Sequence, residues 1–198
     1  QRVTRMGFVI DATASRENAW EQAQVVQAKM FRAASTLGNL ALRLVHFRGY
    51  QIEDHGWLDD PRAVAARMAG VECVSGTTQI LPALRAFLAD APELRASAVI
   101  LVGDAFEEDS GQARDLAAAL KAAGIRVFSF LEGNDWTAES VFRELATVTG
   151  GKFATLGADL PLADLCEGVT LLASGGAKAL ERLPASKAKR LLLSGPSK

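Results

Sequence analysis

The sequence predicts an α/β fold: a doubly wound, mostly parallel central sheet of about six strands with helices on both faces. Two observations predict it. Short apolar runs alternate along the chain with longer segments whose apolar residues recur at helical spacing. The two most apolar runs, residues 7–10 and 98–102, have no polar face, as expected of strands covered on both sides. With 198 residues, of which 49% are hydrophobic, the chain is long enough to bury a sizeable core.

The strands are the apolar runs, and their character differs along the chain. The run at 125–131 is rich in β-branched and aromatic residues, which favours an interior strand. The segment 51–57 is more polar, so it is expected to be a short edge strand. The expected strands lie, in order, at residues 7–10, 41–47, 51–57, 98–102, 125–131 and 152–156.

The helices expected between these strands have marked ends. Ser15 is suited to cap the first helix, Glu17 favours its positive end, and Gly38 ends it. Pro61 begins the second helix, and Gly124 stands at the C-terminal cap of a later one. The expected helices run from 15 to 38, from 61 to about 68, and over 80–87, 113–124, 137–148 and about 161–173.

Composition narrows the classes of function. The net charge of −1 argues against a protein that binds nucleic acid through phosphate contacts. Cys73 and Cys166 supply neither a disulfide framework nor metal-ligand spacing. There is no apolar run of about 18 residues, so no membrane span is expected. No leader is evident, so a cytoplasmic location is expected. The first residue, Gln1, is not Met, which leaves open whether the chain is a piece of something longer. Oligomeric state is not indicated.

Polar side chains follow the first apolar strand at regular spacing. Asp11, Thr13 and Ser15 alternate along the turn, so their three oxygens can converge on one point. A carboxylate and hydroxyls are hard oxygen ligands, which suit Mg²⁺ rather than zinc. Asp104 stands at the end of the other most apolar strand. In doubly wound sheets ligands bind beyond the carboxyl ends of the strands, so Asp11 and Asp104 are expected to meet in one crevice.

With these residues in place, the chain resembles the von Willebrand factor A (VWA) family, which includes the integrin I domain, over about residues 5–173. The metal-ion-dependent adhesion site (MIDAS) of that family reads Asp-x-Ser-x-Ser, then a Thr in a Gly-rich loop, then an Asp after the fourth strand. The corresponding residues here are Asp11, Thr13, Ser15, Thr78 and Asp104. Phe47 and the sequence Gly150-Gly151-Lys152-Phe153 also match the family pattern.

The chain departs from the family pattern at several positions. Thr13 replaces the first Ser but keeps the hydroxyl, and Ala105 follows Asp104 where Gly is common. Arg16 follows the motif, where its guanidinium either competes with the metal or helps to hold an acidic partner. Thr77 is a rival for the role of Thr78, which is preferred because it is in register with the family pattern.

The resemblance implies a VWA-like domain over residues 1–174 that acts by metal-dependent protein–protein interaction and is not an enzyme. A Mg²⁺ ion, or Mn²⁺ or Ca²⁺, would bind a Glu or Asp of a partner protein. Arg16, Thr77 and Phe106 are expected partner contacts, with Trp136 a second aromatic candidate. Residues 175–198 are expected to form a C-terminal helix or tail, a poorly ordered linker or end.

Other interpretations of the same residues remain open. Asp11 and Ser15 can serve only as caps of the first helix, which would leave a metal-free VWA scaffold. A metal-dependent hydrolase or phosphotransfer enzyme is less favoured. A haloacid-dehalogenase-like phosphatase needs an Asp where Thr13 stands, and neither a phosphate-binding Gly-rich loop nor a Gly-x-Ser-x-Gly elbow occurs. His46 and His55 have no Cys or His partner at metal spacing in the sequence, so His46 is expected to be structural, and the acidic run 107–109 a solvated loop.

Overall fold

The computed structural model describes residues 3–11, 23–72 and 74–195. Within them the chain folds around one six-stranded sheet with the order β3-β2-β1-β4-β5-β6. All neighbouring strands are parallel except β2 and β3, which form an antiparallel hairpin at one edge. The doubly wound fold predicted from the sequence is therefore confirmed. The strands are β1 (Val3–Asp11), β2 (Asn39–Arg48), β3 (Gln51–Leu58), β4 (Ala98–Gly103), β5 (Arg126–Leu131) and β6 (Phe153–Thr155).

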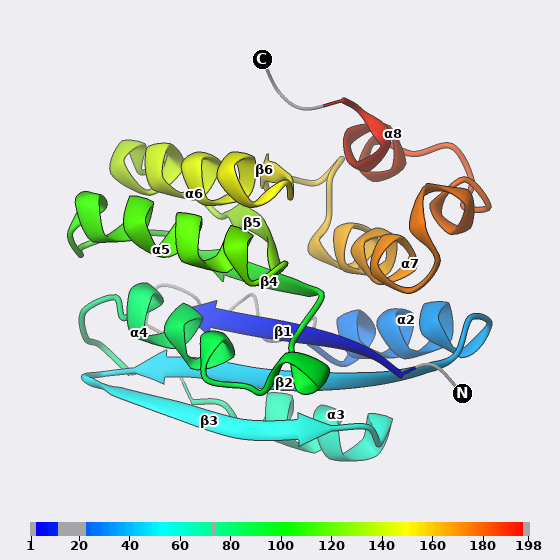
Figure 1. The fold of residues 1–198 in the computed structure, drawn as a ribbon, viewed down its shortest axis with the longest axis horizontal. Helices are drawn as coiled ribbons and strands as arrows, with labels where there is room; N and C mark the ends of the chain where they lie inside the picture. Colours follow the sequence, from blue (N-terminus) through cyan, green and yellow to red (C-terminus); the bar gives the residue numbers. More distant parts are fainter. Residues whose placement is uncertain (1–2, 12–22, 73, 196–198) are drawn as a thin grey trace.

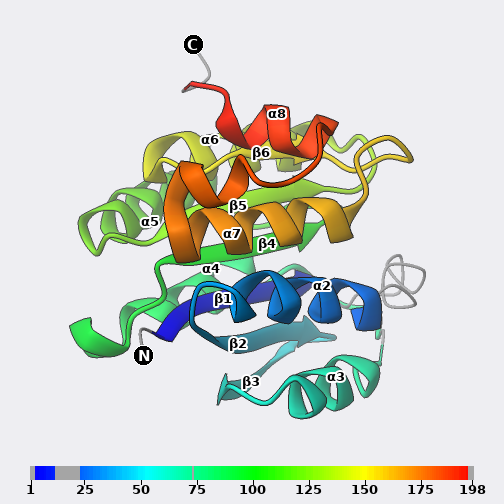
Figure 2. The same ribbon diagram turned by 90° about the vertical axis from the view of Figure 1, so that its right-hand side faces the viewer.

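Helices cover both faces of the sheet (Figures 1 and 2). One face packs against α4, α5 and α6, and the opposite face against α2, α3, α7 and α8. The helices are α2 (Ala23–Ser35), α3 (Pro61–Ala69), α4 (Ile80–Arg85), α5 (Ser110–Ala122), α6 (Trp136–Thr149), α7 (Leu162–Leu180) and α8 (Lys187–Leu193), with 3-10 turns at Ala86–Leu88 and Pro92–Leu94.

The apolar central strands divide their side chains between two cores. On β1, Phe8 and Ile10 join the core under α2 and α7, whereas Val9 joins the core under α4, α5 and α6. Because side chains alternate along a strand, a run that is apolar at every position is what a sheet with two covered faces requires. This alternation places Asp11 on the same face as Val9.

The C-terminal segment is helical as far as the structure describes it. Helix α7 continues past residue 174 to Leu180, with a kink at Gly176, and α8 follows it. Leu180 and Leu192 are buried in the core on the face of the sheet that α7 covers, and both side chains lie close to Gly168 of α7. The Lys152 ammonium donates a hydrogen bond to the carbonyl of Ser194 at 2.6 Å. The sequence prediction for 175–198 allowed a helix or a poorly ordered tail. The buried leucines favour the helix because they extend the apolar core beyond the predicted boundary.

Candidate metal centre

Asp11 and Asp104 stand at the carboxyl ends of the two central parallel strands. Ile10 of β1 pairs with Val102 of β4, so Asp11, the last residue of β1, lies beside Gly103. A Cβ atom built on Gly103 would lie 3.8 Å from the Cβ of Asp11. Asp104 follows directly after β4. The Asp11 side chain is fully buried and that of Asp104 half-buried. The sheet register therefore brings both aspartates to the same rim.

Thr78 is hydrogen-bonded to the loop that carries Asp104. Its hydroxyl accepts a hydrogen bond from the N–H of Glu107 at 2.9 Å and donates one to the carboxylate of Glu108 at 3.1 Å. The N–H of Thr78 in turn donates to the Glu107 carboxylate at 3.0 Å. Thr78 is only 4% exposed, whereas Thr77 is exposed. Of the two threonines, Thr78 is thus the one held against the β4–α5 loop.

Glu108 has a role that its sequence position did not predict. Its carboxylate accepts hydrogen bonds from the N–H groups of Ile80 and Leu81, at 2.8 and 2.9 Å. These groups belong to the first turn of α4, which has no side-chain cap of its own because Gln79 makes no such bond. A carboxylate here also favours the positive end of the helix. Glu108 is therefore a half-buried structural anchor, which corrects the expectation of a solvated loop for this residue.

The other predicted site residues divide into two groups. Thr13, Ser15 and Arg16 lie outside the described residues. Phe106, expected as a partner contact on the surface, is 5% exposed and packs in the core under α4, α5 and α6. Its position after Asp104 points it inward because the loop folds back over that core. Trp136, at the first position of α6, is 85% exposed.

The donors at this rim match the chemistry of a hard divalent cation. Asp11 and Asp104 offer carboxylate oxygens, and Thr78 a hydroxyl. A hydroxyl oxygen has two lone pairs, and the N–H of Glu107 occupies one of those on Thr78, so one remains for a cation. The donors named here are all oxygen atoms, the ligand type that hard divalent cations prefer. The rim therefore fits a divalent cation.

A second polar cluster lies on the opposite face of the sheet, on the β2–β3 hairpin. His46 Nδ1 and His55 Nε2 are 3.1 Å apart, the planes of the two rings are nearly parallel, and His46 Nε2 is 3.4 Å from a carboxylate oxygen of Glu53. Burial lowers the pKa of His46 to about 4, and burial also lowers the pKa of His55. Both imidazoles are therefore neutral at pH 7. Sequence spacing missed this cluster, since only the hairpin register brings the two histidines together.

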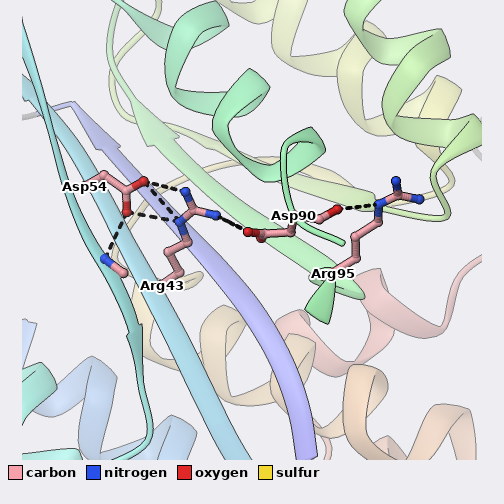
Figure 3. A network of polar contacts seen from close by, with 5 residues as sticks. Arg43, Asp54, Asp90 and Arg95 are labelled. Atoms are coloured by element: carbon pink, nitrogen blue, oxygen red, sulfur yellow. Dashed lines mark hydrogen bonds and ion pairs between the residues drawn. The ribbon is translucent and has the colours of Figure 1, made fainter. Parts of the chain in front are cut away.

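The same hairpin is joined to the body of the fold by Arg43 (Figure 3). The guanidinium of Arg43 donates to both oxygens of Asp54 on β3 and to both oxygens of Asp90, with contacts to Asp90 at 2.8 and 2.9 Å. It also stacks over the ring of Phe87 at 5.2 Å. Asp54 additionally accepts a hydrogen bond from the N–H of Gly56. This network lies on the face opposite His46 and fixes the hairpin from that side.

Comparison with protein-family models gives no match, and comparison with curated proteins gives none either. Solved structures, however, share the fold. Proximal thread matrix protein 1 (PTMP1) from the mussel byssus superposes with a TM-score of 0.65 at 17% identity, covering 87% of this chain and 46% of its own. The VWA domain of SpRpn10 gives 0.65 at 10% identity, covering 82% and 93%. The protein BatB from Bacteroides thetaiotaomicron gives 0.63 at 17%, covering 88% and 99%.

These likenesses define the class of fold: the chain has a VWA-like fold, as the sequence predicted. At such identities they show the fold alone. This chain spans less than half the length of PTMP1, one structure of which has a zinc-occupied MIDAS motif. Among the described residues, no helix is both long and apolar enough to cross a membrane.

Proposed function

We propose that this chain is a metal-ion-dependent protein-interaction domain. A divalent cation of the Mg²⁺ type, with Mn²⁺ and Ca²⁺ as alternatives, is held by Asp11, Thr13, Ser15, Thr78 and Asp104. The proposal is supported by two observations: Asp11 and Asp104 stand at the ends of neighbouring parallel strands of a VWA-like sheet, and the buried Thr78 is hydrogen-bonded to the loop after Asp104. The zinc-occupied MIDAS of PTMP1, a protein with the same fold, supports it.

The protein groups at the rim explain why a partner carboxylate is the expected ligand. The set supplies five groups, three neutral hydroxyls and two carboxylates, which is one fewer than the six oxygen ligands of an octahedral Mg²⁺ ion. The bound ion would therefore supply an exchangeable position that an acidic side chain can take. Thr77, exposed beside Thr78, and Arg16 are retained as proposed partner contacts. Phe106 is not retained because it is buried.

Calorimetric titration of the metal-stripped chain with Mg²⁺ and Mn²⁺ tests the proposal. We expect saturable binding of one ion that is lost in Asp11→Asn and weakened in Thr78→Val. Thr78→Ser, which keeps the hydroxyl, should bind as the parent does. Asp159→Asn is a matched control, since Asp159 pairs with Lys187 at 2.6 Å in the C-terminal part of the chain and not at the rim. Binding retained in Asp11→Asn would contradict the proposal.

A metal-free interaction scaffold is the second candidate, and one observation favours it. The hydroxyl of Thr78 joins its loop to Glu107 and Glu108, a structural role that needs no metal ion. Glu-bearing and Asp-bearing peptides displayed on beads, offered in Mg²⁺ or in excess EDTA, separate the two candidates. Capture only in Mg²⁺ supports the metal-dependent function, whereas equal capture in EDTA supports the scaffold. Turnover of a generic phosphate or ester substrate that is lost in Asp11→Asn would instead indicate an enzyme.

A further inference from the structure

Two imidazoles and one carboxylate converge on the face of the β2–β3 hairpin opposite Asp11. One potential ligand atom from each of His46, Glu53 and His55 lies within 4.8 Å of the other two. His46 is buried, Glu53 and His55 are half-buried, and the Glu53 side chain is 38% exposed. The cluster is therefore closed on the side of the sheet and reachable from solvent on the other. We propose that His46, Glu53 and His55 form a second binding site, specific for a transition-metal ion such as Zn²⁺.

The hairpin geometry sets up this cluster. His46 pairs directly with Glu53 across the antiparallel strands, so their side chains share a face. His55 lies two residues beyond Glu53 and shares that face as well. The ladder shifts register between Arg43 and Val45 of β2, where Gly56 on β3 adopts φ +68°. A bulge of this kind re-aims a neighbouring side chain, and here the neighbour is His55.

The distances suit two ligands of one ion. Nitrogen ligands at 2.0–2.1 Å from a tetrahedral zinc stand about 3.4 Å apart. His46 Nδ1 and His55 Nε2 are 3.1 Å apart, so these two groups are already near the spacing that a shared ion imposes. The partly exposed carboxylate of Glu53 has the freedom to close the remaining distance.

A neighbouring guanidinium orients the carboxylate of Glu53 by binding one of its two oxygens. The Arg48 Nε donates to one oxygen of Glu53 at 2.9 Å, which leaves the other oxygen facing His46. Arg48 also pairs with Glu72 at 3.1 Å, which offsets its positive charge near the proposed ion. Such outer partners orient the ligands of metal sites.

The ligand types indicate which ions the site takes. Imidazole nitrogen suits Zn²⁺, Cu²⁺, Ni²⁺ and Fe²⁺, whereas Mg²⁺ prefers oxygen ligands and dehydrates reluctantly. The proposed site therefore differs in ion preference from the oxygen-rich rim at Asp11. Three protein ligands leave at least one position open to water or to an outside ligand.

The test titrates the whole chain with Zn²⁺ in the presence of excess Mg²⁺. We expect one Zn²⁺ per chain. The chain has only two histidines, so nitrogen NMR of ¹⁵N-histidine-labelled protein should show both rings shifting in step with that one equivalent. His55→Ala and Glu53→Gln should each weaken binding at least about 10-fold. Cys73→Ser tests whether the Cys73 thiol is a Zn²⁺ ligand, and Asp11→Asn tests whether Zn²⁺ binds at the Asp11 rim instead. Both variants should bind Zn²⁺ as the parent does.

Three results would overturn the proposal: parental affinity in His55→Ala, a response from only one of the two rings, or loss of Zn²⁺ binding in Asp11→Asn. His55 and Glu53 are chosen for substitution because they are partly exposed, and circular dichroism of each variant verifies the fold. The site does not depend on the function proposed for the Asp11 rim, so either proposal can fail without the other.

Discussion

The carboxylate of Glu108 holds the hydroxyl of Thr78, 30 residues earlier in the chain, at 3.1 Å. The same carboxylate accepts the N–H groups of Ile80 and Leu81 at the start of α4. One acidic side chain thus fixes both a proposed metal ligand and the helix that follows it. Any ion that binds Thr78 does so on a loop whose position is already set by Glu108.

Replacing Glu108 by Gln should destabilise the fold. Both carboxylate oxygens accept hydrogen bonds, and the amide of Gln keeps only one acceptor oxygen. A backbone N–H of α4 is then left without its partner, at a cost of about 1–3 kcal/mol in the free energy of unfolding. Urea denaturation measures this loss in the free energy of unfolding. Glu107→Gln is the matched control, because a Gln oxygen can still accept the single bond from Thr78 N–H. Equal stability of the two variants would contradict the role assigned to Glu108.

Replacing Arg43 by Met should uncouple the hairpin from the rest of the sheet. The Arg43 side chain is only 12% exposed, and its guanidinium forms ion pairs with Asp54 and Asp90. In the Met variant both half-buried carboxylates lose that ion pair. We expect a loss of about 2–3 kcal/mol in the free energy of unfolding. Arg114→Met serves as control, since Arg114 is 72% exposed and its pair with Glu144 should contribute no resolvable stability. An equally small effect for Arg43→Met would show that the network is dispensable.

Stability should fall as the pH drops from about 6.5 to about 4 in metal-free solution. The unfolded chain protonates His46 near pH 6.5, whereas in the folded chain burial delays protonation to about pH 4. The unfolded state therefore binds more protons in this window, and up to about 3 kcal/mol is lost by pH 4. The other charged groups that act on His46 and His55 are Glu53, Asp54, Arg48 and Arg67.

Urea unfolding in EDTA at several pH values, with His46→Asn alongside, isolates this contribution from that of the carboxylates. The variant should show a shallower decline over the same window. Parallel declines in the two proteins would mean that His46 does not resist protonation.

Gly151→Ala should be strongly destabilising. A Cβ atom at this position would lie 1.8 Å from the carbonyl oxygen of Val127, a backbone atom of β5 that cannot move aside cheaply. We expect a loss of more than about 2 kcal/mol in unfolding free energy. Gly70→Ala is the control: Gly70 has right-handed helical angles and its nearest neighbour would be 3.4 Å away, so the change should be close to neutral. Thermal melts of both variants give the comparison.

The order of strands and helices was predictable because the burial of each element determines its pattern of apolar and polar residues. Strands covered on both faces are apolar at every position, as at 98–102, and the edge strand at 51–57 is recognisably more polar. Asp11 and Asp104 stand out for the same reason, since each interrupts an apolar run at its carboxyl end. Thr13, Ser15 and the bound ion stay predictions.

Residues that act through long-range register were not predictable in this way. Glu108 caps a helix that precedes it by almost 30 residues, and nothing in its own neighbourhood indicates this. The meeting of His46 with His55 depends on the hairpin pairing and on the bulge at Gly56. Phe106 was proposed as a partner contact because it is an aromatic residue near the Asp104 end of the site, yet its side chain packs in the core.

The two candidate sites differ in how much of the chain must assemble before either exists. His46 and His55 are nine residues apart on one hairpin, a local structure that forms within microseconds in small systems. The Asp11 rim forms only when β1 lies beside β4, a pairing between segments separated by most of the first half of the chain. Its loop-closure entropy is therefore far larger than that of the hairpin. During refolding, an ion bound at the proposed histidine site would stabilise the hairpin early, whereas an ion bound at the proposed Asp11 site would indicate that the central sheet is complete.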